Sequence, residues 1–217
     1  MGEDRVVRFE SLNITPRLVE SCMGLYARTW IGPLDTPLRR ACGQFCMGYH
    51  LSRTTLGTVA RSGDDVVGIA LAGSVTHGWL PSQPQWARMM RQARDCLEAA
   101  PWDDRVIPDT LADIDEMQAL ADETAFSDLG LDAELNLVVV DDEWQGHGIG
   151  RKLLHRIGRQ GRLLGWNRMF LVTDTGCDWP ALDHLGFMHV DSVRSSYDRK
   201  LLRMSYVMTT RQMEKLV

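Results

Sequence analysis

Apolar and polar positions change their spacing several times along the chain, and each change marks the boundary of an expected element. Apolar residues recur at intervals of three and four after Thr15 and Pro16, a pair suited to cap a helix. Runs rich in β-branched residues predict strands instead. The expected strands cover residues 6–14, 54–60, 65–75, 134–140, 169–174, 188–193 and 201–209. The expected helices cover residues 16–31, 34–50, 84–100, 110–121, 148–165 and 178–185.

Two stretches of this pattern shape the expected fold. The turn-forming residues 61–64 join two apolar runs and predict a hairpin. Residues 76–132 are helical in pattern and separate the third strand from the fourth, with Asp109 placed to cap the second of two helices. The run ELNLVVV is suited to a strand that is buried on both faces. An α/β fold results, and 217 residues with 44% hydrophobic side chains fit one domain over 1–217.

The charge of the chain is unevenly distributed. The formal net charge is −5, but the segment from Glu98 to Glu134 alone carries −11 and the remainder +6. Such a block is either a solvated face or a surface that attracts cationic substrates, and an acidic chain argues against general nucleic-acid binding.

Composition also suggests a compartment. No segment reaches the apolar length of a membrane span, and the charged start MGEDRVVRFE has no apolar core of a signal peptide. The five cysteines are odd in number and irregularly spaced, so we expect reduced thiols and a cytoplasmic protein with no membrane contact. Cys42 and Cys46 are expected to pack in the core, and the spacing of His184 and His189 does not favour a metal site.

The segment LNLVVVDDEWQGHGIGRKLL is the part of the sequence that indicates chemistry. A strand, a turn with Gly146, Gly148 and Gly150, and a helix follow one another, which points backbone N–H groups and a helix dipole at an anion. Glycines at such a turn also occur for packing alone. Arg151 stands where a dinucleotide-binding fingerprint needs its last glycine, and no G-K-[ST] follows, so neither common nucleotide motif fits.

A different family matches these residues. The segment Gln145-Gly146-His147-Gly148-Ile149-Gly150 resembles the Q/R-x-x-G-x-G/A signature of the GNAT acyltransferases, and HLGF near residue 186 is similar to a second element of that family. The resemblance implies a mixed, mostly antiparallel sheet flanked by helices and splayed after its fourth strand. Residues 76–132 then look like an insertion found in a bacterial subgroup, close to the acceptor side of the cleft.

The resemblance also implies acetyl-coenzyme A as co-substrate, without a metal. Its pyrophosphate would lie on the glycine turn, and its pantetheine arm and thioester would lie beside the fourth strand. The implied contact residues are Val138, Val139, Val140, Gln145, Gly146, His147, Gly148, Ile149, Gly150 and Arg151. The side chain of His147 is expected to face solvent, and Arg151 is favoured for contact with phosphate oxygens.

Transfer to an amine requires a proton acceptor, because an alkyl amine has a pKa of about 10.4. Glu134 lies eleven residues before Gln145, which resembles the spacing of the catalytic glutamate in histone-acetyltransferase members of the family. The alternative is a strand-edge acid that belongs to the acidic block, with water or another residue as the base.

The general acid is less defined. Many family members place a tyrosine four residues before the glycine of LGF, where this chain has Leu182. Tyr197, Tyr206, His184 or Asp183 could substitute, or no acid is used, since a thiolate leaves readily at neutral pH. We expect Cys177 to be a wall residue near the pantetheine end, in preference to a covalent nucleophile.

Three functions remain open at this stage. The favoured one is direct acetyl transfer to a small-molecule or peptide amine, with a cationic acceptor preferred; a homodimer is left open. The absent tyrosine at Leu182 suggests a noncatalytic acyl-coenzyme A binding module as the alternative. A binder of another phosphate ligand would need only the glycine turn and ranks last.

Overall fold

The structure is a computed structural model that describes residues 6–75, 84–100 and 106–217, with the side chains of the last range described from residue 109. Its strands are β1 (Val7–Ser11), β2 (Leu56–Ser62), β3 (Asp65–Ser74), β4 (Ala133–Val140), β5 (Arg168–Asp174), β6 (Met188–Arg194) and β7 (Leu202–Thr209). Its helices are α1 (Pro16–Trp30), α2 (Pro37–Ser52), α3 (Pro84–Glu98), α4 (Val106–Ala125), α5 (Ile149–Leu163), α6 (Pro180–Leu185) and α7 (Thr210–Met213), with the 3₁₀ turn η1 (Asp142–Trp144) before α5.

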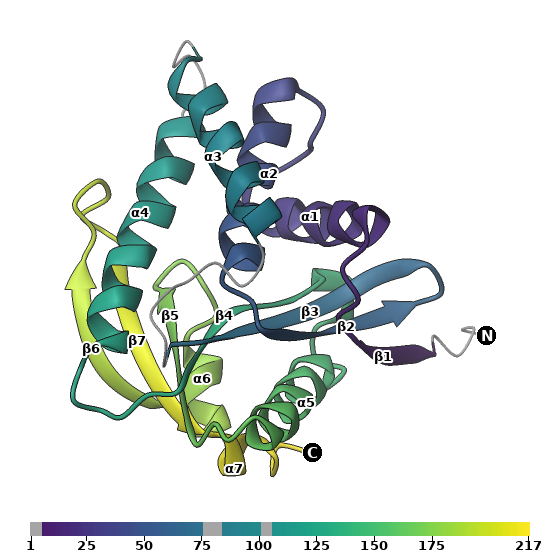
Figure 1. Cartoon of the computed structure of the whole chain (residues 1–217), viewed down its shortest axis with the longest axis vertical. Coiled ribbons are helices and arrows are strands. Elements are labelled where there is room, and N and C mark those ends of the chain that lie inside the picture. The colour runs from purple at the N-terminus through teal and green to yellow at the C-terminus, as the bar shows by residue number, and fades with distance from the viewer. Residues whose placement is uncertain (1–5, 76–83, 101–105) are drawn as a thin grey trace.

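The seven strands form one sheet in the order β1-β2-β3-β4-β5-β7-β6. Every neighbouring pair is antiparallel except β4 and β5, which are parallel. These two strands pair only at Ala133 with Met169 and at Glu134 with Phe170. Beyond that point they diverge, and Figure 1 shows β5, β7 and β6 turned away from β2, β3 and β4. The expected mixed and splayed sheet is therefore confirmed.

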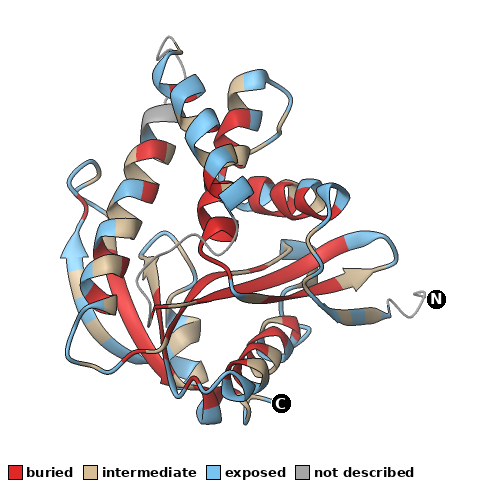
Figure 2. Ribbon diagram, in the orientation of Figure 1, coloured by how far each residue is buried: buried red, intermediate tan, exposed pale blue. Residues whose placement is uncertain are grey.

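Helices cover both faces of the sheet. In Figure 1, α5, α6 and α7 lie below it, and α1 to α4 lie above it. The side chains of β4 contribute to both cores: Leu137 and Val139 join the core under α1, α2 and α3, whereas Ala133 and Leu135 join the core with α5. Figure 2 shows the strands of the middle of the sheet as buried, and the outer faces of α3, α4 and α5 as exposed. We call the side that carries α1 to α4 the upper face.

The inserted helices lie on this upper face. α3 packs against α2, and α4 packs across β5 and β7 beside α2. The expected start of α4 was wrong: the helix begins at Val106, so Asp109 lies in its first turn instead of capping it. Pro108 is compatible with this earlier start. The N–H groups of the first turn make no intrahelical hydrogen bond, so a proline there removes none.

α2 begins three residues later and ends two residues later than the range 34–50 expected from the sequence pattern. Thr36 caps it by accepting a hydrogen bond from the N–H of Arg39, and Pro37 follows the cap. α1 begins with the same arrangement of Thr15 and Pro16. Among the described residues, every helix is too short or too polar to serve as a membrane span.

Candidate functional site

The turn between η1 and α5 is a concave piece of backbone. Gly146 and Gly148 have φ of 76° and 73°, a conformation that side-chain-bearing residues rarely adopt. A Cβ built on either glycine would meet no protein atom within 4 Å, so both positions border open space. Gly148 is the N-cap of α5, and no side chain caps it, which leaves the first N–H groups of the helix without an intrahelical partner. The turn thus offers N–H groups and a positive helix end to an anion.

The side chains of this turn leave that backbone uncovered. Gln145 bonds back to the loop, with its Nε2 donating to Asp142 Oδ1 at 2.8 Å. His147 is exposed, and its Nδ1 donates to the carbonyl of Gln145 at 2.8 Å. Arg151 and Lys152 are exposed at the start of α5. The turn therefore leaves its backbone N–H groups and the side chain of Arg151 exposed to an anion, and the pyrophosphate contacts of residues 145–151 stay a prediction.

β4 presents an unpaired edge next to this turn. Beyond Glu134 no described strand pairs with the side of β4 that faces β5. Its other side pairs with β3, where Leu71 lies opposite Leu137 but Ala72 opposite Leu135, so Asn136 is an extra, bulged residue. Val138, Val139 and Val140 follow the bulge. Their backbone groups toward β5 are suited to an extended ligand that lies in the splay.

Glu134 lies where β4 and β5 last pair. Its side chain points to the upper face and is 4% exposed. Arg53, the residue after α2, donates Nε and Nη2 to the same carboxylate oxygen, Oε2, at 3.2 and 3.0 Å. No described residue is assigned a hydrogen bond to Oε1. Burial raises the pKa of Glu134, and the guanidinium of Arg53 offsets only part of that rise.

Known structures share this arrangement of elements. A GNAT-family protein from Desulfovibrio desulfuricans superposes with a TM-score of 0.56 at 16% identity, over 94% of this chain and 99% of that one. The polyamine N-acetyltransferase of Drosophila melanogaster gives 0.56 at 14% identity, over 93% and 100%. The NatC complex bound to Gag peptide and CoA gives 0.51 at 12% identity, over 94% and 98%. The chain has the GNAT fold. No model of a known protein family matches the sequence, and no curated protein sequence does.

The acids of α3 and α4 that line the upper face of this GNAT fold do not form one surface. Arg203 of β7 is 1% exposed and contacts Asp113 at 2.6 Å, Asp174 at 2.8 Å and Glu116 at 3.4 Å. We call these four residues the Arg203 cluster. Burial raises the pKa of Glu116, but hydrogen bonds from Ser196 outweigh it and bring the pKa to about 2.

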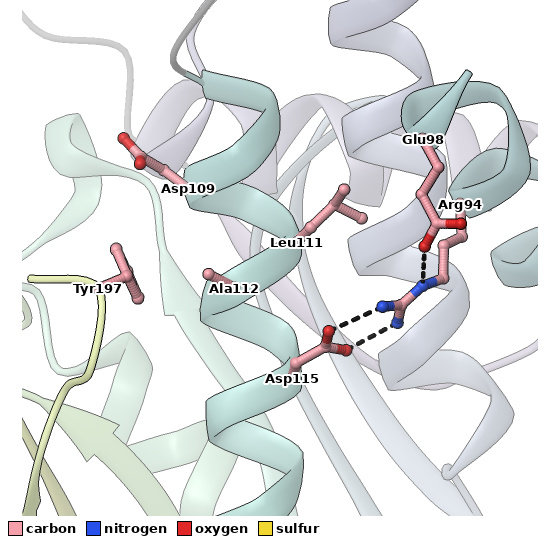
Figure 3. A pocket seen from close by; sticks show the side chains of 7 residues that line it. All are labelled: Arg94, Glu98, Asp109, Leu111, Ala112, Asp115 and Tyr197. Atoms are coloured by element: carbon pink, nitrogen blue, oxygen red, sulfur yellow. Dashed lines mark hydrogen bonds and ion pairs between the residues drawn. The ribbon is translucent and has the colours of Figure 1, made fainter. Parts of the chain in front are cut away.

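The neighbouring acid of α4 turns away from the Arg203 cluster. Asp115 receives two hydrogen bonds from Arg94 of α3, at 2.7 and 2.8 Å, and Glu98 receives a third. Figure 3 shows these groups and Tyr197 around an open hollow of about 540 Å³ on the surface of α4. Its lining is acidic, yet Asp115 and Glu98 are already paired with Arg94.

The positions considered for a general acid are spread over two faces. Leu182 packs in the core with α5, so no phenol is present there. Tyr206 is buried in the same core, and its hydroxyl donates to the sulfur of Met204 at 3.9 Å. Tyr197 lies on the upper face, where burial and Asp113 raise its pKa to about 12. His184 and Asp183 are exposed on α6.

Cys177 follows β5 on the approach to the splay and is half-buried. Burial and Asp174 raise the pKa of its thiol, while hydrogen bonding to Thr173 and Trp30 lowers it only in part. A thiol with a raised pKa is a poor nucleophile, which agrees with a wall residue. Within the described ranges, no group of His, Cys, Asp and Glu is arranged to hold a metal ion.

Sequence reasoning missed the partners of the acids. Arg53 gave no signal, because a single arginine after a helix is ordinary. Arg203 did give one, since an arginine inside the apolar run LLRMSYVMT is charged at a strand position expected to be buried. Such a residue requires carboxylates nearby, and the acidic insertion supplies them.

Proposed function

We propose that this chain transfers the acetyl group of acetyl-coenzyme A to a primary amine, with Glu134 as the general base. The observation that carries the proposal is the combination of an open glycine turn with an unpaired β4 edge that leads to a buried carboxylate. The similar folds of a polyamine N-acetyltransferase and of a complex bound to CoA support it. A cationic acceptor is favoured, because the Arg203 cluster sets three carboxylates against one guanidinium on the upper face.

In this mechanism acetyl-coenzyme A supplies the activated acetyl thioester. The N–H groups at residues 146–150 bind its pyrophosphate, and Arg151 adds a charge-assisted contact. Backbone N–H groups among Val138, Val139 and Val140 polarise the thioester carbonyl as an oxyanion hole does. The amine nitrogen forms the new C–N bond, and the C–S bond breaks.

Glu134 takes the first proton of the ammonium at Oε1, directly or through a water molecule. The second proton leaves with the sulfur as the thiol of coenzyme A. The raised pKa of Glu134 suits this role, since a base is most effective when its pKa approaches the working pH. Arg53 keeps the buried carboxylate ionised and leaves one oxygen available.

Replacement of Glu134 by Gln tests the base. We expect turnover at neutral pH to fall by about 10²- to 10⁴-fold with unchanged affinity for acetyl-coenzyme A. The unfolding midpoint should also fall, because the buried Arg53 loses its ionised partner, so the assay is run well below that midpoint. The loss of turnover should shrink at high pH, where more amine is already neutral, so the measurement is kcat against pH with free thiol as the readout. Glu123→Gln, an exposed acid on α4, is the matched control. An equal loss at every pH would move the role to water or another side chain.

A noncatalytic acyl-coenzyme A binding module is the second candidate, favoured by the absence of a phenol at Leu182. Calorimetry with acetyl-coenzyme A and a thiol-release assay over a panel of amines separate the two. The panel contains spermidine, putrescine, phenethylamine and an alanine-terminated tetrapeptide. Binding without thiol release from any of these amines would support the module and contradict the enzyme.

A further inference from the structure

Unpaired polar atoms gather around Glu134. Among the described residues, four buried side-chain atoms have no hydrogen-bond partner: His50 Nδ1, Asp122 Oδ1, Asn136 Oδ1 and Ser205 Oγ. Three of these four belong to the surroundings of the Arg53–Glu134 pair. Asn136 is two residues along β4, His50 is three residues before Arg53, and Asp122 lies 3.9 Å from Arg53. A buried polar group left unpaired is unfavourable by about 1 to 3 kcal/mol. Three such groups close together therefore require a physical explanation.

The amide nitrogen of Asn136 is also only weakly hydrogen-bonded. Its Nδ2 donates to the backbone carbonyl of His50 at 3.4 Å, longer than the usual N–H···O distance. That carbonyl already accepts from Thr54 Oγ1 at 2.8 Å. Asn136 is also the bulged residue of β4, and bulges re-aim side chains beside active sites. The chain thus places an amide on the upper face that its own residues do not satisfy.

His50 lies beside this amide as a neutral imidazole. Burial, and then the positive charge of Arg53, lower its pKa to about 3. Its ring lies 5.1 Å from the ring of Tyr49 and 5.6 Å from that of Tyr26. Tyr26 lies 4.6 Å from Trp30, which is 43% exposed. A row of rings therefore connects the buried polar pair with the surface at the end of α1.

We propose that Asn136 and His50 bind the nitrogen of the acceptor amine. A protonated primary amine has three N–H donors, and Asn136 Oδ1, His50 Nδ1 and Glu134 Oε1 are three oxygen or nitrogen atoms to which no described residue donates. Glu134 removes one proton, and the two remaining N–H groups stay hydrogen-bonded to Asn136 and His50 until the C–N bond forms, when one of them gives up its proton to the departing sulfur. The lone pair forms on the side of the nitrogen that faced Glu134, and the two retained hydrogen bonds fix that direction for attack on a thioester bound on the same side, which makes the attack effectively unimolecular. His50 must carry its proton on Nε2 for this role.

This inference rests on the proposed acetyl transfer and names the residues that select a primary amine. A secondary or tertiary amine offers fewer donors to the same pair. We therefore expect kcat/KM for phenethylamine to exceed that for N-methylphenethylamine.

Replacement of Asn136 by Leu separates binding from a structural role. If the amide binds the acceptor, kcat/KM for the best amine of the panel falls by about 10- to 100-fold, because the reacting nitrogen loses its hydrogen bond to Asn136 and is no longer aligned on His50. The affinity for acetyl-coenzyme A stays the same. The midpoint of thermal unfolding stays the same or rises by about 2 to 4 °C, because an unpaired amide has been removed. A structural role predicts the opposite, with a lower midpoint.

Ser205→Ala is the matched control. Ser205 Oγ is the fourth unpaired atom, on β7, and β5 lies between β7 and β4. We expect this variant to keep full kcat/KM and an unchanged or slightly higher midpoint. His50→Leu should lower kcat/KM like Asn136→Leu, and the double variant should lose less than the product of the two single losses.

The outcomes are distinguishable from failure of the proposed function. Full amine turnover by Asn136→Leu and His50→Leu would overturn the inference while acetyl transfer stands. Thiol release by the wild-type chain with none of the panel amines would overturn both. A fall in kcat/KM that follows a fall in the unfolding midpoint would also count against the inference.

Discussion

The glycine turn after β4 and the upper face of β4 use different kinds of chemistry. The turn offers backbone N–H groups of one continuous segment, it is exposed, and its side chains leave the backbone uncovered. The upper face offers side chains from distant parts of the chain, such as Arg53 and Glu134, which are 81 residues apart and buried. A ligand that binds the turn meets groups already in place. An acceptor that binds the upper face would meet carboxylates whose negative charge is already partly neutralised by arginines.

The difference predicts that the two regions fail in different ways. Changes in the turn should affect affinity for coenzyme A and leave folding intact. Changes among the buried ion pairs should affect folding first, because a charge left alone in the interior is strongly unfavourable. The following four experiments test this division, from the largest expected effect to the smallest.

Replacement of Arg203 by Met should give the largest effect. It leaves Asp113, Glu116 and Asp174 facing one another without their common cation, so we expect the free energy of unfolding to fall by about 3 to 5 kcal/mol. Urea unfolding measures it. Arg94→Met is the control, since its pairs with Asp115 and Glu98 are exposed and contribute at most about 1 kcal/mol. Similar losses in both variants would show that the Arg203 cluster contributes no more to the free energy of unfolding than an exposed ion pair does.

Replacement of Gly148 by Val tests the turn itself. The residue has φ of 73°, and a branched side chain there would both strain the backbone and fill the space where phosphate approaches. We expect affinity for acetyl-coenzyme A, measured by calorimetry, to fall by about 100-fold or more, which is about 2.7 kcal/mol.

The control for that experiment is Gly130→Val. Gly130 has φ of 62° and equally open surroundings, but it lies before β4, away from the turn. It should reproduce the backbone strain and keep the affinity. If both variants keep the affinity, the turn is not the pyrophosphate site.

A third experiment reports on the interior through pH. His50 has a folded pKa of about 3, well below its ordinary value near 6.5, so the unfolded chain binds a proton that the folded chain does not. The contribution of His50 to the free energy of unfolding is therefore fully present above pH 6.5. It is lost progressively as the pH falls toward 3. Between pH 7 and pH 4.5 we expect His50 to account for a loss of about 2 to 3 kcal/mol. The difference in urea unfolding between wild type and His50→Leu at the two pH values measures it, and identical pH dependence of the two proteins would place His50 in contact with water.

The two regions also differ in how far the sequence predicted them. The glycine turn was predicted at the correct residues, because its strand, glycines and helix are continuous and each has a local physical reason. The hairpin of β2 and β3 and the splayed sheet were confirmed for similar reasons. The upper face could not be predicted in the same way. The pairing of Arg53 with Glu134, and of Arg203 with Asp113 of α4 90 residues away, depends on how α2 and α4 pack on the sheet. The bulge at Asn136 was likewise hidden, since the run ELNLVVV reads as a regular strand.

The error at the start of α4 has the same origin. Asp109 is a good capping residue by type, but the helix continues through Pro108 to Val106. A proline prevents a helix only beyond the first turn, so the local rule allowed either start. The acids of α4 were treated as one face for a related reason. Three-dimensional structure separates Asp113 and Glu116, which contact β7, from Asp115, which contacts α3.

This separation sharpens the prediction for a cationic acceptor, which carries the smallest expected effect. Asp115 has both oxygens on Arg94, and Glu116 has both oxygens on Arg203 and Ser196. Asp113 differs, because Arg203 and Tyr197 both bond to its Oδ1 and no described residue is assigned a hydrogen bond to Oδ2. Its side chain is 35% exposed, so an acceptor cation can reach it.

We therefore expect spermidine to exceed phenethylamine in kcat/KM by a few-fold to about 10-fold at low salt, with a smaller advantage at 0.5 M salt, where charges are screened within a few ångströms. Asp113→Asn should remove most of that advantage, whereas Asp115→Asn should keep it, and both should bind acetyl-coenzyme A normally. Because Asp113 also pairs with Arg203, the unfolding midpoint of each variant has to be measured alongside, and the assay run well below it. An advantage that Asp115→Asn reduces as much as Asp113→Asn would mean that the whole acidic surface attracts the acceptor at long range. Equal rates for both amines at low salt would mean that the buried cation of Arg203 already neutralises the upper face.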